Sequence, residues 1–380
     1  MSTQQHRTRV LPSRRPRTAV LATASLGALA LVAGLAAPAS ATVIGTVSPA
    51  KTSYDRPALV DFGTEEGTEL AVWAGTDTDG HINVATVDDE SAAVIGSTWT
   101  DSSSSTYQGT GVAAAHAGYA EAVTTDYVAV AWTDLNAVVH VGILDSAHNA
   151  IACESTNFGY SYDTPDLTFA REAPGDAVAE DLYLTTVDSG GHMHVTQVVD
   201  NPANAGCLGG PGVPNAGTNL FAPGDSTEIT SDTTYDGPTL FDVSPQSYPT
   251  LLMVWAGTNS AHTMNAAFFS PDVPTLSQKY VESGEATTAD LSSATRYTTG
   301  ETLVTYCGTN NLVYGQAFGD QNSAKPLWNE SLGGSCNIYT NAAGYINGGV
   351  APVFDTTNSL FEYLYPNKGN LDLTLGQEAP

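Results

Sequence analysis

Residues 56–62 read RPALVDF, and residues 70–87 read LAVWAGTDTDGHINVATV. Together they give a proline, a short apolar strand, a second strand that ends in Trp-Ala-Gly-Thr, a polar turn and a third strand. The same succession returns six times along the chain, at intervals of roughly 50–70 residues. A repeat of this length is typical of one supersecondary unit that is used several times, so the period indicates the architecture before any single residue is considered.

Three features recur among the six copies. A proline or a small residue opens each first strand, where a missing N–H costs no ladder hydrogen bond: Pro57, Gly111, Pro165, Pro238, Ala289 and Ala351. An aromatic residue recurs late in the second strand of five copies, the third copy being degenerate around Thr186: Trp73, Trp132, Trp255, Tyr306 and Tyr365. A polar residue recurs in the third strand: Asn83, His140, His194, Asn265 and Asp372.

Strand signals dominate the chain, because Val, Thr, Tyr and Ile alternate with polar residues while 36 Gly and 20 Pro interrupt any helical period. Each copy has room for a fourth short strand. The sequence therefore predicts an all-β fold, a β-propeller of about six blades with four antiparallel strands each. A single sandwich or a parallel β-helix does not explain the period. We expect one propeller domain over 52–380, preceded by a short linker over 42–51.

The N-terminal segment has the pattern of a secretory signal peptide. Residues 1–18 carry five arginines and no acidic residue, an apolar run follows over 19–36, and Ala39-Ser40-Ala41 is a small-x-small cleavage signature. We expect cleavage after Ala41 and a secreted, extracellular protein, exported by either the general or the twin-arginine route. An uncleaved membrane anchor is the alternative, since the apolar run approaches the length of a span.

The charge of the mature chain limits its partners. Residues 1–41 contain five of the 12 Lys+Arg and none of the 40 Asp+Glu, so seven basic residues remain against 40 acidic ones, a net charge of −33. Phosphate binding needs clustered basic residues, which excludes nucleic acid and anionic lipid as partners. We expect a soluble monomer. The acidity is also compatible with Ca²⁺ or with a cationic surface, although solubility alone explains it.

Four cysteines in an exported chain indicate disulfides. Of the three possible pairings, we expect Cys153–Cys207 and Cys307–Cys336, because sequential pairing ties neighbouring repeats together. No spacing of Cys and His suggests zinc.

The succession of opening proline, strand, W-x-G-T, polar turn and I-N-V resembles the repeat of sialidase-like propellers and of bacterial fucose-binding lectin propellers. The resemblance is strongest over 56–87 and 237–269, and it concerns the repeat and not a site. A sialidase would use three arginines for its substrate carboxylate, and the mature chain has three, Arg56, Arg171 and Arg296. However, Arg56 directly precedes Pro57 instead of being separated from it, and no intact S-x-D-x-G-x-x-W box occurs.

Other chemistry has weaker support. A glycosidase needs two carboxylates that flank the scissile bond, and Asp55, Glu172 and Glu180 are nominal candidates only. Asp77 and Asp79 belong to a truncated calcium-loop motif, although a hairpin turn explains these residues more simply. His192 and His194 lie on one face of a strand and would bind a metal if a neighbouring blade supplied a third ligand. No G-x-S-x-G motif occurs, so a serine hydrolase is not supported.

The recurrent aromatic and polar positions give the functional hypothesis. Aromatic faces accept the C–H face of a sugar, and amides and imidazoles bind its hydroxyls, so the candidate ligand-binding residues are Trp73, Trp132, Trp255, Asn83, His140, His194 and Asn265. The alternative is that the tryptophans form the core between blades. We expect a carbohydrate- or cell-surface-binding propeller without a cofactor, Ca²⁺ being the one possible addition. A glycoside hydrolase and a protein-interaction propeller are the alternatives.

Overall fold

Short runs of alternating apolar residues form the strands of six antiparallel four-stranded sheets, as predicted. The description rests on a computed structural model, which describes residues 41–61, 67–77, 80–106, 110–117, 127–144, 151–171, 180–200, 221–234, 236–244, 250–270, 273–296, 299–340 and 346–378. All of them belong to the unit Ala39–Pro380. None of the described segments contains a helix long and apolar enough to cross a membrane.

Blades 1 to 3 follow one another along the chain. Blade 1 consists of β2 (Ala58–Asp61), β3 (Thr68–Ala74), β4 (Ile82–Asp88) and β5 (Val94–Asp101). Blade 2 consists of β6 (Val112–Ala117), β7 (Tyr127–Thr133), β8 (Val139–Leu144) and β9 (Ile151–Ser155). Blade 3 consists of β10 (Asp166–Arg171), β11 (Glu180–Val187), β12 (His192–Asp200) and β13 (Phe221–Thr233).

Blades 4 to 6 continue the series. Blade 4 consists of β14 (Thr239–Asp242), β15 (Leu251–Ala256), β16 (Thr263–Ser270) and β17 (Val273–Ala286). Blade 5 consists of β18 (Ser292–Arg296), β19 (Glu301–Cys307), β20 (Leu312–Phe318) and β21 (Trp328–Ser335). Blade 6 consists of β24 (Ala351–Asp355), β25 (Leu360–Pro366), β26 (Leu373–Glu378) and β1 (Thr42–Thr46), and a hairpin of β22 (Tyr339–Thr340) and β23 (Ile346–Asn347) precedes it.

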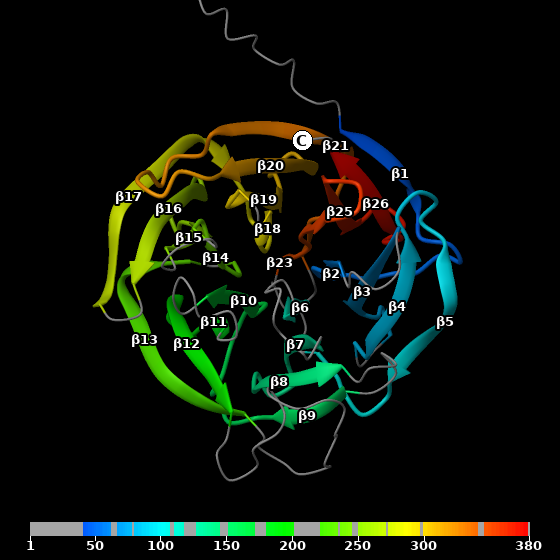
Figure 1. Ribbon diagram of the computed structural model, residues 1–380, viewed down its shortest axis with the longest axis horizontal. Helices are drawn as coiled ribbons and strands as arrows, with labels where there is room; N and C mark the ends of the chain where they lie inside the picture. Colours follow the sequence, from blue (N-terminus) through cyan, green and yellow to red (C-terminus); the bar gives the residue numbers. More distant parts are fainter. Residues whose placement is uncertain are drawn as a thin grey trace, which may run out of the picture. The chain divides into compact units, whose positions relative to one another are not determined.

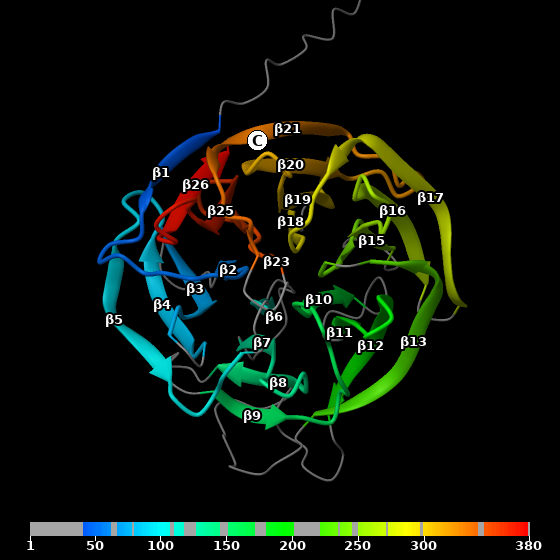
Figure 2. The same ribbon diagram turned by 180° about the vertical axis from the view of Figure 1, so that it is seen from behind.

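The six sheets are arranged as a ring around a central axis (Figures 1 and 2). The first strand of each blade is the innermost one, and each inner strand contacts the inner strands of the two neighbouring blades: β2, β6, β10, β14, β18 and β24. The contact between β24 and β2 closes the circle. The prediction of a six-bladed propeller is confirmed.

The outer strand of blade 6 comes from the start of the described chain. β1 pairs antiparallel with β26, with Thr42 opposite Gln377 and Thr46 opposite Thr374. The next residue, Val47, is buried and donates its N–H to Leu373 O at 2.8 Å. The expectation of a linker over 42–51 is therefore wrong for Thr42–Thr46. These residues form the fourth strand of blade 6, although the other three strands of that blade lie more than 300 residues later in the sequence.

The core lies between the blades. Each strand turns one face toward the preceding blade and the other toward the following one, so apolar residues on both faces are buried. Trp132 of β7, for example, packs with Val60, Leu70 and Val84 of blade 1. This two-sided burial explains why the second strands read as almost continuous apolar runs, such as LLMVWA in β15, where all six residues are buried.

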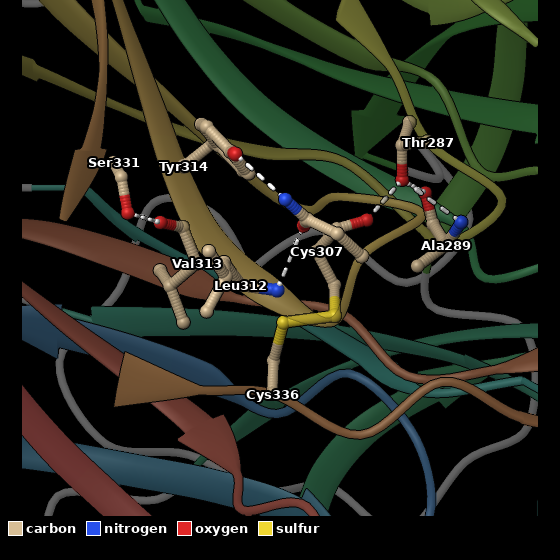
Figure 3. The surroundings of a disulfide bond; sticks show 9 residues. Thr287, Ala289, Cys307, Leu312, Val313, Tyr314, Ser331 and Cys336 are labelled. Atoms are coloured by element: carbon tan, nitrogen blue, oxygen red, sulfur yellow. Dashed lines mark hydrogen bonds between the residues drawn. A yellow bond between two sulfur atoms is a disulfide. The ribbon is translucent and has the colours of Figure 1, made fainter. Parts of the chain in front are cut away.

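A disulfide joins Cys307, at the end of β19, to Cys336, just after β21 (Figure 3). Both residues are buried, and Cys307 O also accepts a hydrogen bond from Thr287 Oγ1 at 2.7 Å. The backbone of Cys336 in turn bridges to Asn367 of blade 6. The Cys307–Cys336 pairing is thus confirmed, whereas Cys207 of the other expected pair lies outside the described residues.

Candidate functional site

The inner strands enclose a cavity of about 110 Å³ on the propeller axis, to which all six blades contribute. Its polar lining consists of Asp61, His116, Thr168, Asp242, Ser293 and Thr295. Its aromatic lining consists of Phe169, Phe241 and Phe354. We call this cavity the axial pocket. It combines hydroxyls, an imidazole and carboxylates with flat apolar rings, which are the groups that bind polyhydroxylated ligands.

Hydrogen bonds from the backbone hold the two acidic side chains of the axial pocket in place. Asp242 Oδ1 accepts the N–H groups of Ser244 at 2.8 Å and Thr250 at 3.0 Å, at the turn that follows β14. Asp61 Oδ2 accepts the N–H of Thr356 at 2.9 Å and its hydroxyl at 2.7 Å. Because both acids are the last residues of inner strands, the strand ends place them on the same side of the ring.

A single arginine fills the axis at the starts of the inner strands. Arg56, which precedes β2, is only 1% exposed. Its guanidinium donates to Leu291 O before β18, to Pro165 O at 2.6 Å and to Asp166 Oδ1 of β10 at 3.3 Å. One side chain of blade 1 therefore bonds blades 3 and 5 across the ring.

The chain leaves room for this arginine by using glycine. A Cβ atom on Gly349 would lie 2.7 Å from Arg56 Cβ, and one on Gly111 would lie 2.2 Å from Arg56 O. Both approaches are shorter than a carbon side chain tolerates. The small opening residue of blade 2, Gly111, thus serves the packing around Arg56, as does Gly349, which precedes the first strand of blade 6 by two residues.

Buried aspartates lie, like Arg56, just before the inner strands. Burial, reinforced by the negative charge of Asp290, raises the pKa values of Asp55, Asp163 and Asp236 well above the usual range. Burial also raises the pKa of Asp166, to about 6, against the opposing effect of Arg56. Burial thus favours the neutral form of these carboxyl groups, and we call the group that they form with Arg56 at this end of the axis the Arg56 plug.

The tryptophans of the predicted ligand-binding set lie in the core. Trp73, Trp132 and Trp255 are 2%, 1% and 1% exposed, and each packs against the blade before its own. Their ring faces are not accessible to a sugar. The structure supports the alternative interpretation, in which the recurrent aromatic residue is a packing element.

The recurrent polar residues lie directly across the strand from these aromatic positions. The pairs are Trp73–Asn83, Trp132–His140, Thr186–His194 and Trp255–Asn265. In blade 6 Thr374, and not Asp372 as expected, lies opposite Tyr365, because the first two of the residues NLDL belong to the turn.

Local contacts engage the polar residues. Asn83 and Asn265 each donate to the carbonyl two residues earlier, at 2.9 Å in both blades. His140 stacks on Trp132 with ring centroids 4.8 Å apart and contacts Glu154 Oε1 at 2.5 Å. Burial tends to lower the pKa of His140, but Glu154 and Asp134 raise it overall. These residues belong to different blades and do not converge on one pocket.

Asp77 belongs to a turn motif that recurs in every blade and that we did not predict from the sequence. In this motif the side-chain oxygen of an Asp or Asn accepts backbone N–H groups two or four positions later, in an Asx-type turn between the second and third strands. Its counterparts are Asp77, Asp134, Asp188, Asn259, Asn310 and Asn370. The turn interpretation of Asp77 is thereby supported, and Asp79 lies outside the described residues.

His192 and His194 do share a neighbour. Asp188 Oδ2 lies 3.2 Å from His192 Nδ1 and 3.4 Å from His194 Nε2, and Glu228 Oε1 lies 3.8 Å from His192 Nδ1. Hydrogen bonds from this turn lower the pKa of Asp188 to about 2, although its partial burial acts in the opposite direction. The additional ligands come from the same blade and not from a neighbouring one, and all of these groups are substantially solvated.

The three arginines of the sialidase-like alternative do not converge. The Arg56 guanidinium lies beside Leu291, and five residues of nearly extended chain, about 16 Å, separate Leu291 from Arg296. Arg296 instead lies over the Phe354 ring, 4.8 Å from its centroid, and pairs with Glu301 at 3.5 Å. The side chain of Arg171 is outside the described part. Arg56 is inaccessible to any substrate.

Of the three candidate catalytic acids, Asp55 alone has a side chain within the described residues. Asp55 is buried beside the Arg56 plug. Glu172 and the side chain of Glu180 lie outside what the structure describes. Asp61 and Asp242, which do reach the axial pocket, were missed, although a signal exists: an aspartate stands four residues after the opening residue in three copies, as Asp61, Asp242 and Asp355.

Comparison with solved structures finds the same fold in several proteins. A fucose-specific lectin from Aleuria aurantia superimposes with a TM-score of 0.51 at 11% identity, covering 87% of this chain and 93% of that one. AofleA from Arthrobotrys oligospora gives a TM-score of 0.53 at 9% identity, over 85% and 83%. A protein of unknown function from Dyadobacter fermentans gives 0.52 at 8% identity, over 90% and 99%. These similarities establish the propeller fold.

No protein-family model matches the chain. No match is found among curated proteins.

Proposed function

We propose that the protein is an exported carbohydrate-binding propeller whose sugar site is the axial pocket. The observation that carries the proposal is the lining of this pocket, where Asp61 and Asp242 lie among the rings of Phe169, Phe241 and Phe354. Carboxylates accept two sugar hydroxyls at once, and aromatic faces take the C–H face of the pyranose. The fold is shared with a protein described as a fucose-specific lectin, which is consistent with this use of the scaffold.

The remaining parts of the proposal follow from the sequence. The pattern over 1–41 supports export to the cell exterior, where glycans and cell-surface polysaccharides are available as ligands. The strongly acidic composition favours neutral sugars over sulfated or phosphorylated ones, because like charges repel. A site on the axis is shared by all six blades, so this proposal predicts one site per chain instead of one per blade.

The experiment is a glycan-array screen, followed by titration calorimetry with the best neutral monosaccharide. We expect a stoichiometry near one. Asp242→Asn keeps an oxygen for the N–H groups of Ser244 and Thr250 but removes the charge, and we expect affinity to fall by about 10–100-fold, the effect of one charge-assisted hydrogen bond. His194→Ala, outside the axial pocket, is the matched control and should bind normally.

Three results would contradict the proposal. Several equivalent sites per chain would favour the ring of recurrent polar residues over the axial pocket. An array without any bound glycan would leave an interaction scaffold, and turnover of a bound glycoside would indicate the hydrolase alternative.

A further inference from the structure

A second feature lies between blades 1 and 6 and shares only Asp61 with the axial pocket. Five carboxylates meet between blade 1 and blade 6, and we call them the interblade carboxylates. They are Asp61 at the end of β2, Glu69 in β3, Asp89 after β4, Asp355 at the end of β24 and Glu362 in β25. Their exposed fractions lie between 0% and 5%, so all five are withdrawn from water.

The ligand atoms of the interblade carboxylates are close together. In the triad Asp61, Glu69 and Asp355, one oxygen from each residue lies within 4.8 Å of the others, and the same holds for Asp89, Asp355 and Glu362. Calcium binds oxygens at about 2.3–2.6 Å, so two oxygens on opposite sides of one ion are about 4.6–5.2 Å apart. The spacing is therefore that of oxygens that share an ion, with Asp355 common to both triads.

Protein groups satisfy only part of this cluster. Asp355 accepts the N–H groups of Thr357 at 2.7 Å and Asn358 at 3.1 Å, which fixes the central carboxylate. In contrast, Glu69 Oε2, Asp89 Oδ1 and Glu362 Oε2 are buried and accept no hydrogen bond. A buried acceptor without a partner costs about 1–3 kcal/mol, and a charged one costs more. Three such oxygens on residues of one cluster point to a ligand that completes them.

The members of the cluster also repel one another. Burial and the other carboxylates raise the pKa of Glu69 well above its usual range, and the same causes raise the pKa of Glu362 to about 9. The pKa shifts of Glu69 and Glu362 thus reflect mutual repulsion between buried carboxylates, which a bound cation would relieve.

We propose that the interblade carboxylates bind a Ca²⁺ ion that fastens the last blade of the propeller to the first. Hard carboxylate oxygens without nitrogen or sulfur ligands select Ca²⁺ or Mg²⁺ over transition metals. Mg²⁺ keeps several waters, and so a dry site with several carboxylates suits Ca²⁺. The ligands come from residues 61–89 and 355–362, and the ion therefore joins the two ends of the fold where the ring closes. This site is distinct from the truncated calcium-loop motif at Asp77 and Asp79.

The test is calcium binding by the purified protein after treatment with EDTA. Calorimetric melting in about 1 mM CaCl₂ should raise Tm by about 5 °C when the ion is in hundredfold excess over its Kd. The same concentration of MgCl₂ should give a smaller shift. Equilibrium dialysis should recover bound calcium in stoichiometric amount. Absence of both bound calcium and a Tm shift would overturn the proposal and leave shared protons as the means of neutralisation.

Substitutions of single candidate ligands test where the calcium ion binds. Glu362→Gln keeps the side-chain volume and removes one ligand charge, and we expect calcium affinity to fall at least tenfold; roughly the same holds for Glu69→Gln if the first variant does not fold. Asp188→Asn, in the solvated triad with His192 and Glu228, is the matched control and should bind calcium normally. Loss of binding in Asp188→Asn, with normal binding in Glu362→Gln, would refute the assignment. Neither result depends on whether the axial pocket binds a sugar.

Discussion

Replacing Arg56 by methionine tests whether one side chain holds the ring together. The change removes the bonds to Leu291 O, Pro165 O and Asp166 while retaining a similar unbranched chain. Breaking a buried ion pair by removing one partner costs about 3–5 kcal/mol, because the other charge stays buried. We expect the free energy of unfolding at about pH 7.5 to fall by this amount, a large fraction of the stability of a domain.

The loss should depend on pH in a defined direction. The folded-state pKa of Asp166 is about 6, above the usual 3.8, so this residue contributes stability below pH 3.8 that is lost as the pH rises through 6. Arg56 opposes that loss, and without it the pKa of Asp166 moves higher still. At about pH 5 Asp166 is largely neutral in both proteins, and only the unpaired carbonyls remain, about 1–3 kcal/mol.

The assay is urea unfolding at about pH 5 and pH 7.5, with Arg56→Met/Asp166→Asn as the rescue. The double variant should lose the extra pH dependence. Arg296→Met is the matched control: its pair with Glu301 is partly exposed, and we expect a change of less than about 1 kcal/mol. A loss below about 1 kcal/mol in Arg56→Met, or an equal loss at both pH values, would refute the view of Arg56 as a charged plug.

Four further outcomes are expected. Trp255→Ala should lower the free energy of unfolding by about 3–5 kcal/mol in urea titrations. A variant of unchanged stability with weakened glycan binding would instead show that Trp255 binds the ligand. Replacing Cys307 and Cys336 together by serine should cost about 3–4 kcal/mol, given their separation of 29 residues; an unchanged Tm would contradict this. Asp163→Asn should raise Tm at about pH 7.5 more than at about pH 5, because burial and Asp290 raise the pKa of Asp163 and so make its ionisation oppose folding. A larger increase in Tm at about pH 5 would contradict the raised pKa of Asp163. Deleting Thr42–Thr46 should expose the edge of β26, lower Tm and promote self-association in size-exclusion chromatography, whereas a stable monomer would show that β1 is dispensable.

The fold was predictable because its signals are local and repeated. The opening residue, the late aromatic residue and the polar turn all lie within a single blade, so each blade can be recognised from a short stretch of sequence. The structure places these features at equivalent points of successive sheets. The pairing Cys307–Cys336 was accessible for the same reason. The third strand of blade 6 was misaligned by two residues, since NLDL lacks the apolar alternation of the other copies.

The axial pocket and the Arg56 plug were not predictable in the same way. They depend on residues more than a hundred positions apart, such as Arg56 with Asp166 and Leu291, which meet only when the ring closes. The tryptophans misled because a repeated aromatic residue satisfies the requirements of a sugar platform and of an interblade core equally well. Only the accessible surface of the folded ring distinguishes the two.

The pairing of β1 with β26 also has a consequence for the order of folding. β1 is synthesised before any blade, but its partner is the last strand of the described chain, so it has no sheet to join until translation of the domain is almost finished. Bringing together segments more than 300 residues apart carries a large loop-closure entropy and makes this pairing late and slow. During that interval an unpaired strand is exposed to neighbouring nascent chains, and the yield of native protein depends on how quickly the two ends meet.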